Sequence, residues 1–179
     1  SIVNASRAWG IMVKDYINNK HAQTKLSYAE LKKIQLQLIH RHFAWLTALR
    51  YQLREPRSWE AIYKTHNQEY KDKWFTVEEQ NGKLEETLAK YLSAEELNQV
   101  MKKSNKAAHL ITLQSKQLHE LHNSGYIEDF RHMELEKSLI EFLNQQGASE
   151  RIKNFPYPRQ YATLNLYFIR IFVFLVPLG

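Results

Sequence analysis

Residues 27–56, SYAELKKIQLQLIHRHFAWLTALRYQLREP, contain the signals for one long helix. Ser27 and Glu30 have the spacing of a capping box, in which the serine hydroxyl accepts from the N3 amide and the glutamate accepts from the N–H of the cap. Behind this box, apolar side chains recur at helical spacing over a face wider than a coiled-coil seam. Pro56 ends the helix because it restricts Glu55 and cannot donate a hydrogen bond in a helix interior. The stretch therefore predicts a long helix that packs on more than one side.

The composition agrees with a helical protein. The chain has 179 residues and 44% hydrophobic content, which suffices for one domain with a buried core. It contains only 5 glycines and 4 prolines, while leucine, lysine, glutamine, glutamate and alanine are abundant. Such a composition favours long helices over sheets. We therefore expect an all-α fold, built as a long-helix bundle.

Cysteine content and charge exclude several classes of protein. There are no cysteines, which excludes a disulfide framework, a thiolate zinc site and a cysteine nucleophile. The formal net charge is +6, but the lysines and arginines are spread along the chain. No zinc-finger spacing, RNA-binding aromatic signature or continuous basic block is found. Solvated helix faces account for most of this charge, and no nucleic-acid partner is expected.

Further helices follow from the apolar periodicity. Residues 1–19 carry an apolar stripe with no clear N-cap before it, so the sequence begins as if inside a helix. A second capping box at residues 93–96 predicts another long helix, which the turn residues 123–125 close. Residues 126–144 predict one more helix, and Gly147 is placed to act as its left-handed cap.

The middle of the chain has a weaker signal. A short helical piece at residues 59–70 is followed by DKWFTVEEQNGK at residues 72–83, in which Asn81-Gly82 indicates a turn. No internal repeat is present.

The final segment differs from the rest of the chain. Residues 162–178 are apolar except at four positions, Thr163, Asn165, Arg170 and Pro177. A membrane span needs about 20 mostly apolar residues, so this segment is a nearly complete span or one cut short. A soluble core helix would not be aromatic on all sides in this way. We expect residues 161–179 to start a membrane-spanning helix, and the sequence to be a piece of a longer polypeptide.

Basic residues orient this segment. Arg151, Lys153 and Arg159 lie just before the apolar run, so the positive-inside rule places the preceding residues 1–160 in the cytoplasm. Arg170 lies inside the run, where a charge is costly in lipid, and it is expected to face protein or water. The candidates for lining a pore or vestibule are therefore Arg170 and Asn165 in this segment and Arg159 just before it.

The histidines raise the question of a metal site. His119 and His122 share a helical face, as two zinc ligands require. Their motif, HELH, is one residue short of H-E-x-x-H, so the second histidine is rotated away from zincin geometry. A metal-dependent helical enzyme would use these histidines with Glu120 or Glu136. Because no phosphate loop, nucleophile elbow, dinucleotide fingerprint or kinase motif is present, we expect no enzyme activity, no metal and no cofactor.

Arginines recur among aromatic residues near the end of the first long helix. Arg50 and Arg54 are four residues apart and share a face, so they can receive an acidic group or a helix C-terminus. Ion pairing between helices or subunits is the preferred interpretation, and ligand binding is the alternative.

Three stretches resemble bacterial bestrophin-like channels. Residues 147–179, GASERIKNFPYPRQYATLNLYFIRIFVFLVPLG, are similar to the segment where Gly-Ala-Cys-Glu-Arg-Ile precedes Asn-Thr-Pro-x-Pro-x-x-Tyr and a membrane helix ending in Leu-Pro-Phe-Gly. Residues 4–15, NASRAWGIMVKD, look like the Arg-x-x-Trp-Gly segment that follows the second membrane helix of the family. Residues 41–55, RHFAWLTALRYQLRE, resemble its helix with an Ala-Leu-Arg-x-x-Leu-Arg core. The family-motif positions in this sequence are Trp9, Arg50, Arg54, Glu150, Arg151, Pro156, Pro158 and Tyr161.

The resemblance implies a subunit of a pentameric, mostly helical ion channel in the bacterial inner membrane. Its partners would be chloride or other small ions, further copies of the chain and membrane lipid. Glu150 and Arg151 are expected to tie the joint before the membrane helix to neighbouring helices, or to form a surface ion pair. Ser149 and Phe155 stand where the family usually has Cys and Thr, and anion versus cation selectivity stays open. The hydrophobic pore neck of the family lies on a helix outside this sequence.

A second interpretation stays open. The same pattern fits a soluble helical-bundle interaction domain that oligomerises through its apolar tail. Solubility of the purified chain without detergent would favour this alternative.

Overall fold

The computed structural model describes residues 1–57, 65–74, 79, 82–155 and 159–178. Within these ranges all regular structure is helical, which confirms the all-α prediction. The helices in chain order are α1 (Ile2–Tyr16), α2 (Tyr28–Arg54), α3 (Thr65–Trp74), α5 (Leu84–Leu88), α6 (Ala94–Met101), α7 (Lys106–Asn123), α8 (Asp129–Asn154), α9 (Arg159–Leu175) and the short 3₁₀ helix η2 (Val176–Leu178).

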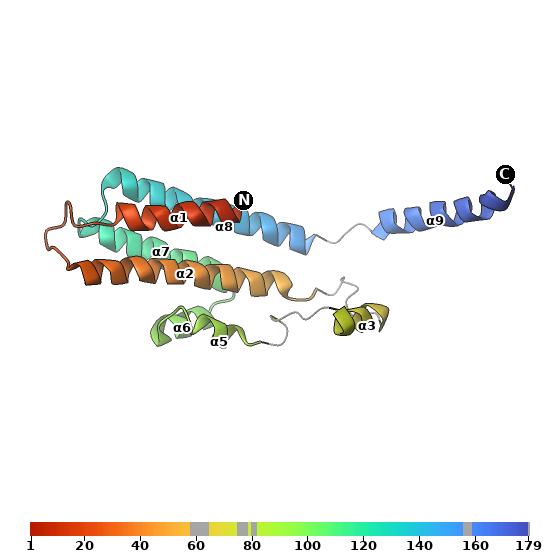
Figure 1. Cartoon of the computed structure of the whole chain (residues 1–179), viewed down its shortest axis with the longest axis horizontal. Coiled ribbons are helices and arrows are strands. Elements are labelled where there is room, and N and C mark those ends of the chain that lie inside the picture. Colours follow the sequence, from red (N-terminus) through yellow and green to blue (C-terminus); the bar gives the residue numbers. More distant parts are fainter. Residues whose placement is uncertain (58–64, 75–78, 80–81, 156–158, 179) are drawn as a thin grey trace.

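Four long helices form a bundle. α2 packs against α7 and α1, and α8 packs against α7 and α1, with fewer contacts between α2 and α8. The short helices α5 and α6 pack on α2 and α7, so α8 lies along one side of the bundle and α5 and α6 along the other (Figure 1). α2 and α8 begin at the same end of the bundle and run in the same direction, whereas α9 lies apart beyond the opposite end (Figure 1).

The capping box at Ser27 is present as predicted. The Glu30 amide donates to the Ser27 hydroxyl at 3.3 Å, and the Ser27 amide donates to the Glu30 carboxylate at 2.8 Å. α2 then runs without interruption to Arg54, next to the residue that Pro56 restricts. Its buried residues lie on one face, where they meet the other three helices of the bundle.

Large side chains from all four long helices fill the core. Trp9 and Val13 of α1, which lie on the predicted apolar stripe, are fully buried. The other fully buried large side chains of the bundle are Leu38 and Trp45 of α2, Leu110, Gln114 and Leu118 of α7, and Leu135, Leu139 and Phe142 of α8. Each such hydrophobic side chain contributes about 1.5–3 kcal/mol by leaving water, so the bundle has a core of its own.

The second capping box is also correct, but the helix that follows is shorter than predicted. Ser93 and Glu96 exchange both hydrogen bonds of the box. The helix ends at Met101, and a new helix begins at Lys106. The break occurs because the Asn105 side chain accepts from the Ala108 amide at 2.9 Å and so acts as a fresh N-cap.

Of the two helix ends predicted near glycines, the turn at residues 123–125 is correct and the cap at Gly147 is wrong. Gly125 has φ 77° and donates to the His122 carbonyl at 2.9 Å, which closes α7 as a left-handed cap. A β-carbon at Gly125 would lie 2.5 Å from the His21 carbonyl oxygen, so only glycine fits there. Gly147 instead lies inside α8, which continues to Asn154. The side chains of its neighbour Gln146 and of Glu150 hold this part of the helix against the bundle.

Two weaker predictions are tested only in part. The helical piece expected at residues 59–70 coincides with α3 from Thr65 onward, and its beginning lies outside the described residues. The turn predicted at Asn81-Gly82 is not tested either, because Asn81 lies outside the described residues.

The helix expected from Tyr126 begins three residues later, at Asp129. The Tyr126 hydroxyl instead donates a hydrogen bond to the Thr24 carbonyl at 2.9 Å.

Candidate functional site at the terminal helix and its junction

The terminal helix α9 presents apolar side chains on all sides without burying any described one. It has 17 residues. Leu164, Ile169 and Phe172 point in different directions around the helix, yet each is at least half exposed. Soluble domains rarely expose a contiguous apolar surface of this extent unless it meets a partner or a membrane. The helix is therefore the strongest candidate for an interaction segment in the chain.

Among the residues that the structure describes, no helix combines the length and the apolar character that crossing a membrane requires.

The predicted pore candidates are placed along α9. Asn165 and Arg170 are exposed, and Arg170 borders a shallow groove with apolar walls that include Val173 and Phe174. Arg159 begins the helix, but its side chain is outside the described part of the chain. Asn165 and Arg170 are five residues apart and therefore point to different sides of the helix. A single path along one face of α9 contacts one of these two side chains, not both.

A polar junction joins the bundle at the end that leads to α9. We use this name for Trp45 and Gln52 of α2, Asn105 at the start of α7, and Gln146 and Glu150 of α8. The Gln146 amide oxygen accepts from the Trp45 indole at 2.9 Å, and the Gln146 amide nitrogen donates to Glu150 at 2.7 Å. The same Glu150 oxygen accepts from Gln52 at 2.9 Å and from Asn105 at 3.5 Å. The predicted role of Glu150 as a tie to neighbouring helices is therefore visible, whereas Arg151 is exposed.

Replacing Gln146, the residue at the centre of the polar junction, is expected to lower the free energy of unfolding. The variant Gln146→Leu keeps the side-chain volume but leaves the fully buried Trp45 indole N–H without its acceptor. We expect the free energy of unfolding to fall by about 2 kcal/mol, since an unsatisfied buried donor costs about 1–3 kcal/mol. Urea unfolding followed by helical circular dichroism measures this change. The neighbouring Gln145→Leu is the control, because Gln145 bonds only Glu141 on its own helix, and an equal loss in both variants would contradict the assignment.

The remaining family-motif positions divide between core and surface. Trp9 is fully buried and stacks on His42 with ring centroids 6.1 Å apart. Arg50 pairs with Glu79 at 2.8 Å, which agrees with the preferred ion-pair interpretation. Arg54 and Tyr161 are exposed, and Pro156 and Pro158 lie outside the described residues.

An aromatic cluster surrounds His42 in the core. His42 is 3% exposed, and its ring centroid lies 4.8 Å from that of Phe142 and 5.2 Å from that of Trp45. Neither ring nitrogen has a hydrogen-bond partner among the described residues. Burial away from water disfavours the charged imidazolium and lowers the pKa of His42 to about 4. His42 is therefore neutral at physiological pH, and it does not form a site with His40, which lies beside Tyr91.

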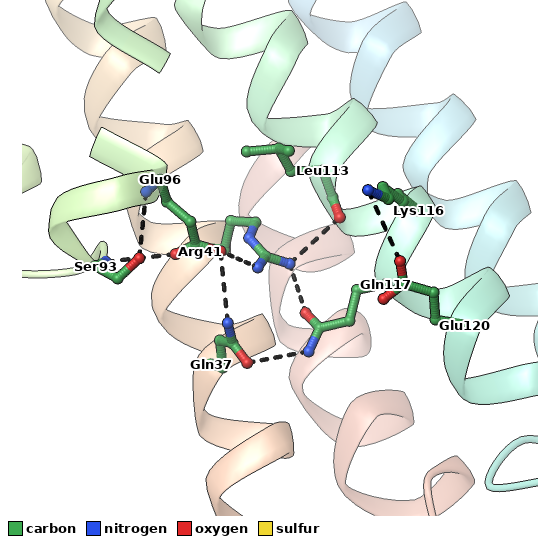
Figure 2. A network of polar contacts seen from close by, with 8 residues as sticks. All are labelled: Gln37, Arg41, Ser93, Glu96, Leu113, Lys116, Gln117 and Glu120. Atoms are coloured by element: carbon green, nitrogen blue, oxygen red, sulfur yellow. Dashed lines mark hydrogen bonds and ion pairs between the residues drawn. The ribbon is translucent and has the colours of Figure 1, made fainter. Parts of the chain in front are cut away.

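A second polar network crosses the bundle around Arg41, which the sequence analysis had not distinguished from its neighbours. Arg41 is 4% exposed and pairs with Glu96 of α6, while its guanidinium also donates to the Leu113 carbonyl at 3.4 Å. Gln117 and Gln37 close the ring of contacts, with 3.1 Å between their amide groups (Figure 2). Although burial raises the pKa of Glu96, the hydrogen bond and charge of Arg41 and the cap at Ser93 lower it by more, so its pKa lies below the usual value. The network joins α2, α6 and α7.

The histidines of the hypothetical metal site have other partners. His122 stacks on His132 with centroids 4.5 Å apart and bonds Asp129 at 2.8 Å. Glu120 lies 3.9 Å from Lys116, and Glu136 accepts from the Ser115 hydroxyl at 3.0 Å. In the part of the chain that the structure covers, no three histidine, aspartate or glutamate side chains are grouped to hold a metal ion.

The polar junction contains residues that sequence reasoning missed. Gln146 follows Leu135, Leu139 and Phe142 at helical spacing and is 2% exposed. A polar residue in step with an apolar stripe is a usable signal, because a buried amide requires partners. Asn105 had a signal too, since asparagine before a helical run is a favoured N-cap. For Gln52 and Trp45, no sequence signal indicated a place in the polar junction, apart from their position on α2.

Comparisons with known proteins relate this architecture to others. A sequence-family model of bacterial and fungal bestrophin proteins matches residues 3–179. A crystal structure of a membrane protein superposes with a TM-score of 0.70 at 15% identity over 98% of this chain and 52% of the other. A bacterial bestrophin homologue from Klebsiella pneumoniae, carrying a single substitution, gives a TM-score of 0.69 at 15% identity, again over 98% of this chain and 52% of the other. No curated protein sequence matches. The chain thus spans about half the length of these solved proteins, and at this identity they show a shared fold.

Proposed function

The chain belongs to the bacterial and fungal bestrophin family, and from this membership we propose that it forms part of a subunit of an ion channel in the bacterial inner membrane. One observation carries the proposal, namely that α9 exposes apolar side chains all around while the rest of the chain buries its own core. Each apolar side chain that moves from water into lipid gains about 1.5–3 kcal/mol. A lipid environment therefore accounts for a surface that water does not favour.

In this proposal the chain has two parts. Residues 1–160 are the cytoplasmic helical bundle, and residues 161–179 start a membrane-spanning helix. Exposed Arg151 lies near the end of the first part, which agrees with a cytoplasmic boundary there. The complete channel is a homo-oligomer, as a pentamer, that passes chloride or other small anions, or small cations, and contacts membrane lipid around α9.

Arg170 is the residue that we assign to the ion path. A guanidinium in the middle of an apolar helix faces lipid only at a high cost, so it is expected to face another subunit or water. A unit charge about 10 Å from a passing ion, at an effective dielectric constant of about 20, changes its energy by about 1.7 kcal/mol. This energy corresponds to a change in rate of more than tenfold. The same charge lowers the energy of an anion and raises that of a cation, so Arg170 would favour anions over cations by about twice this energy, which corresponds to roughly a hundredfold or more in rate.

Flux through liposomes tests the proposal. The complete polypeptide that contains this sequence is reconstituted, and anion and cation fluxes are compared with those of Arg170→Ala. We expect the ratio of anion to cation flux to fall by roughly a hundredfold in the variant. The control is Arg7→Ala, because Arg7 is exposed on α1 in the bundle. Absence of any flux from an oligomer verified to be folded would reject the channel proposal.

The alternative, a soluble interaction domain that oligomerises through its tail, rests on the same exposure of α9. In that case the apolar side chains of α9 are covered by other copies of the chain. A stable oligomer of the purified chain that needs no detergent, together with absence of flux, would favour it.

A further inference from the structure

A second apolar surface lies on α8, away from the terminal helix. Phe130, Met133 and Ile140 are 78%, 54% and 56% exposed and lie on the side of α8 opposite to its buried residues. We call these three residues the α8 stripe. Glu134 and Glu141 border the stripe along one edge and are exposed, and Glu134 pairs at 2.7 Å with Lys137, whose position on the helix falls within the stripe. Large apolar side chains in such an arrangement mark an interaction surface when they are contiguous.

A complementary groove lies on α2. It has a volume of about 830 Å³ and runs between the first half of α2 and the segment before α6. Tyr28 and Leu36 are 78% and 45% exposed on its floor, and Tyr91 borders it from the other segment. Lys32 and Lys33 also line it, and neither forms an ion pair with a carboxylate in the described part of the chain. We call this feature the α2 groove.

The two surfaces have related positions in the bundle. The α8 stripe and the α2 groove lie on opposite sides, since α8 and α2 occupy opposite sides of the bundle and each surface faces away from the core (Figure 1). Both helices begin at the same end of the bundle (Figure 1). There the Tyr126 hydroxyl, just before α8, donates a hydrogen bond at 2.9 Å to the Thr24 carbonyl, just before α2. The stripe covers about 15 Å of α8 and the groove about 18 Å of α2. The two surfaces are therefore similar in length and lie at a similar level along the bundle.

From this placement we infer that the α8 stripe of one copy of the chain docks in the α2 groove of the next copy. The inference rests on the proposed function in so far as the channel is a homo-oligomer. A contact between two different surfaces is head-to-tail, and such contacts close into a ring when the rotation allows. Lys32 and Lys33 of the α2 groove can meet Glu141 at the edge of the α8 stripe, which forms no ion pair among the described residues, so these groups add complementary charge to the apolar contact.

A membrane does not explain the α8 stripe. α8 is about 39 Å long, and Phe130 lies in its first turn, at the end of the bundle opposite to α9 (Figure 1). If α9 enters the membrane, the stripe points away from the lipid. A second copy of the chain is therefore the occupant that the arrangement favours.

Cysteine cross-linking tests the contact directly, because the chain contains no cysteine. The double variant Leu36→Cys/Met133→Cys, in the complete polypeptide in detergent, is oxidised under mild conditions and separated on a denaturing gel. We expect most of the monomer band to be lost to a ladder of covalent oligomers that ends in a closed ring. Each single variant is expected to stay monomeric on the gel, because the two surfaces differ. The matched control pairs Leu36→Cys with Ile11→Cys, an exposed position on α1, and is expected to stay monomeric too.

Charge reversal gives an independent measurement. Glu141→Lys places a positive charge against the lysines of the α2 groove, and we expect a loss of oligomer affinity of about tenfold. Lys33→Glu in the same chain is expected to restore it. An oligomer of unchanged size that forms no Leu36–Met133 cross-link would overturn the contact and leave the channel proposal standing. A chain that is monomeric in both detergent and lipid would overturn the channel proposal itself.

Discussion

Replacing Arg41 by methionine is expected to lower the free energy of unfolding by about 3 kcal/mol, since breaking a buried ion pair costs about 3–5 kcal/mol. Stability is lost because the substitution leaves the polar partners of Arg41 without their hydrogen-bond donor. Arg41 is 4% exposed and compensates the charge of Glu96, whose side chain is 18% exposed. Without the guanidinium, this carboxylate stays charged in a mostly buried place, and the Gln117 amide oxygen loses the donor from which it accepts a hydrogen bond. Urea unfolding followed by helical circular dichroism measures the loss.

The double variant Arg41→Met/Glu96→Leu separates the charge effect from a packing effect. Replacing both charges by apolar groups of similar size is often neutral or stabilising, so most of the lost stability is expected to return. Arg54→Met is the control on the same helix, because Arg54 is exposed and such substitutions stay within about 0.5 kcal/mol. A loss below about 1 kcal/mol for Arg41→Met would show that the pair contributes little and that water reaches Glu96.

Lowering the pH from 7 to 4 is expected to remove about 3 kcal/mol of stability through His42 alone. Burial lowers the pKa of His42 from 6.5 to about 4. Below pH 6.5 the unfolded chain therefore takes up a proton at this position while the folded chain does not. Stability due to His42 is complete above pH 6.5 and is lost as the pH falls towards 4. Thermal or urea unfolding at intervals of half a pH unit measures the slope.

The variant His42→Phe is the control for this slope. It removes the titrating group but keeps an aromatic ring beside Trp9, Trp45 and Phe142. We expect its stability to be flatter between pH 6.5 and 4.5. The depressed pKa of Glu96 adds a separate loss, because protonation of the unfolded chain is favoured only below about 4.5 at that residue. Equal slopes for the variant and the unchanged chain above pH 4.5 would contradict the assignment to His42.

Local signals predicted the helix boundaries well where the physical cause is local. The capping boxes at Ser27 and Ser93 form because their partners are three residues away, and Pro56 acts on its own neighbour. Gly125 caps α7 because the backbone there needs positive φ, a condition that nearby turn residues indicate. Gly147 looks similar in sequence, yet α8 passes through it. The difference comes from Gln146 and its bonds to α2, which no local pattern contains.

The polar contacts between helices could not be predicted in the same way. Arg41, Arg50 and Arg54 lie in one basic and aromatic stretch, but the first is buried, the second pairs with Glu79 and the third is exposed. Their environments depend on which helix packs on each face of α2, and packing brings together residues as far apart in sequence as 55 and 101 positions. Composition did reveal α9, because an apolar run remains apolar whatever surrounds it. The proposed ion path would depend on groups from other copies of the chain, and one chain does not supply them.

The length of α8 has a mechanical consequence. This helix is continuous over 26 residues and carries the α8 stripe along its first half and the polar junction near its last turn. It therefore acts as a stiff lever about 39 Å long. A tilt of about 5° around the Gly125 turn would move its far end by about 3 Å, as much as the distance of a hydrogen bond. If further copies of the chain dock on the α8 stripe as proposed, a shift of those copies would be amplified at the last turn of α8, which precedes α9.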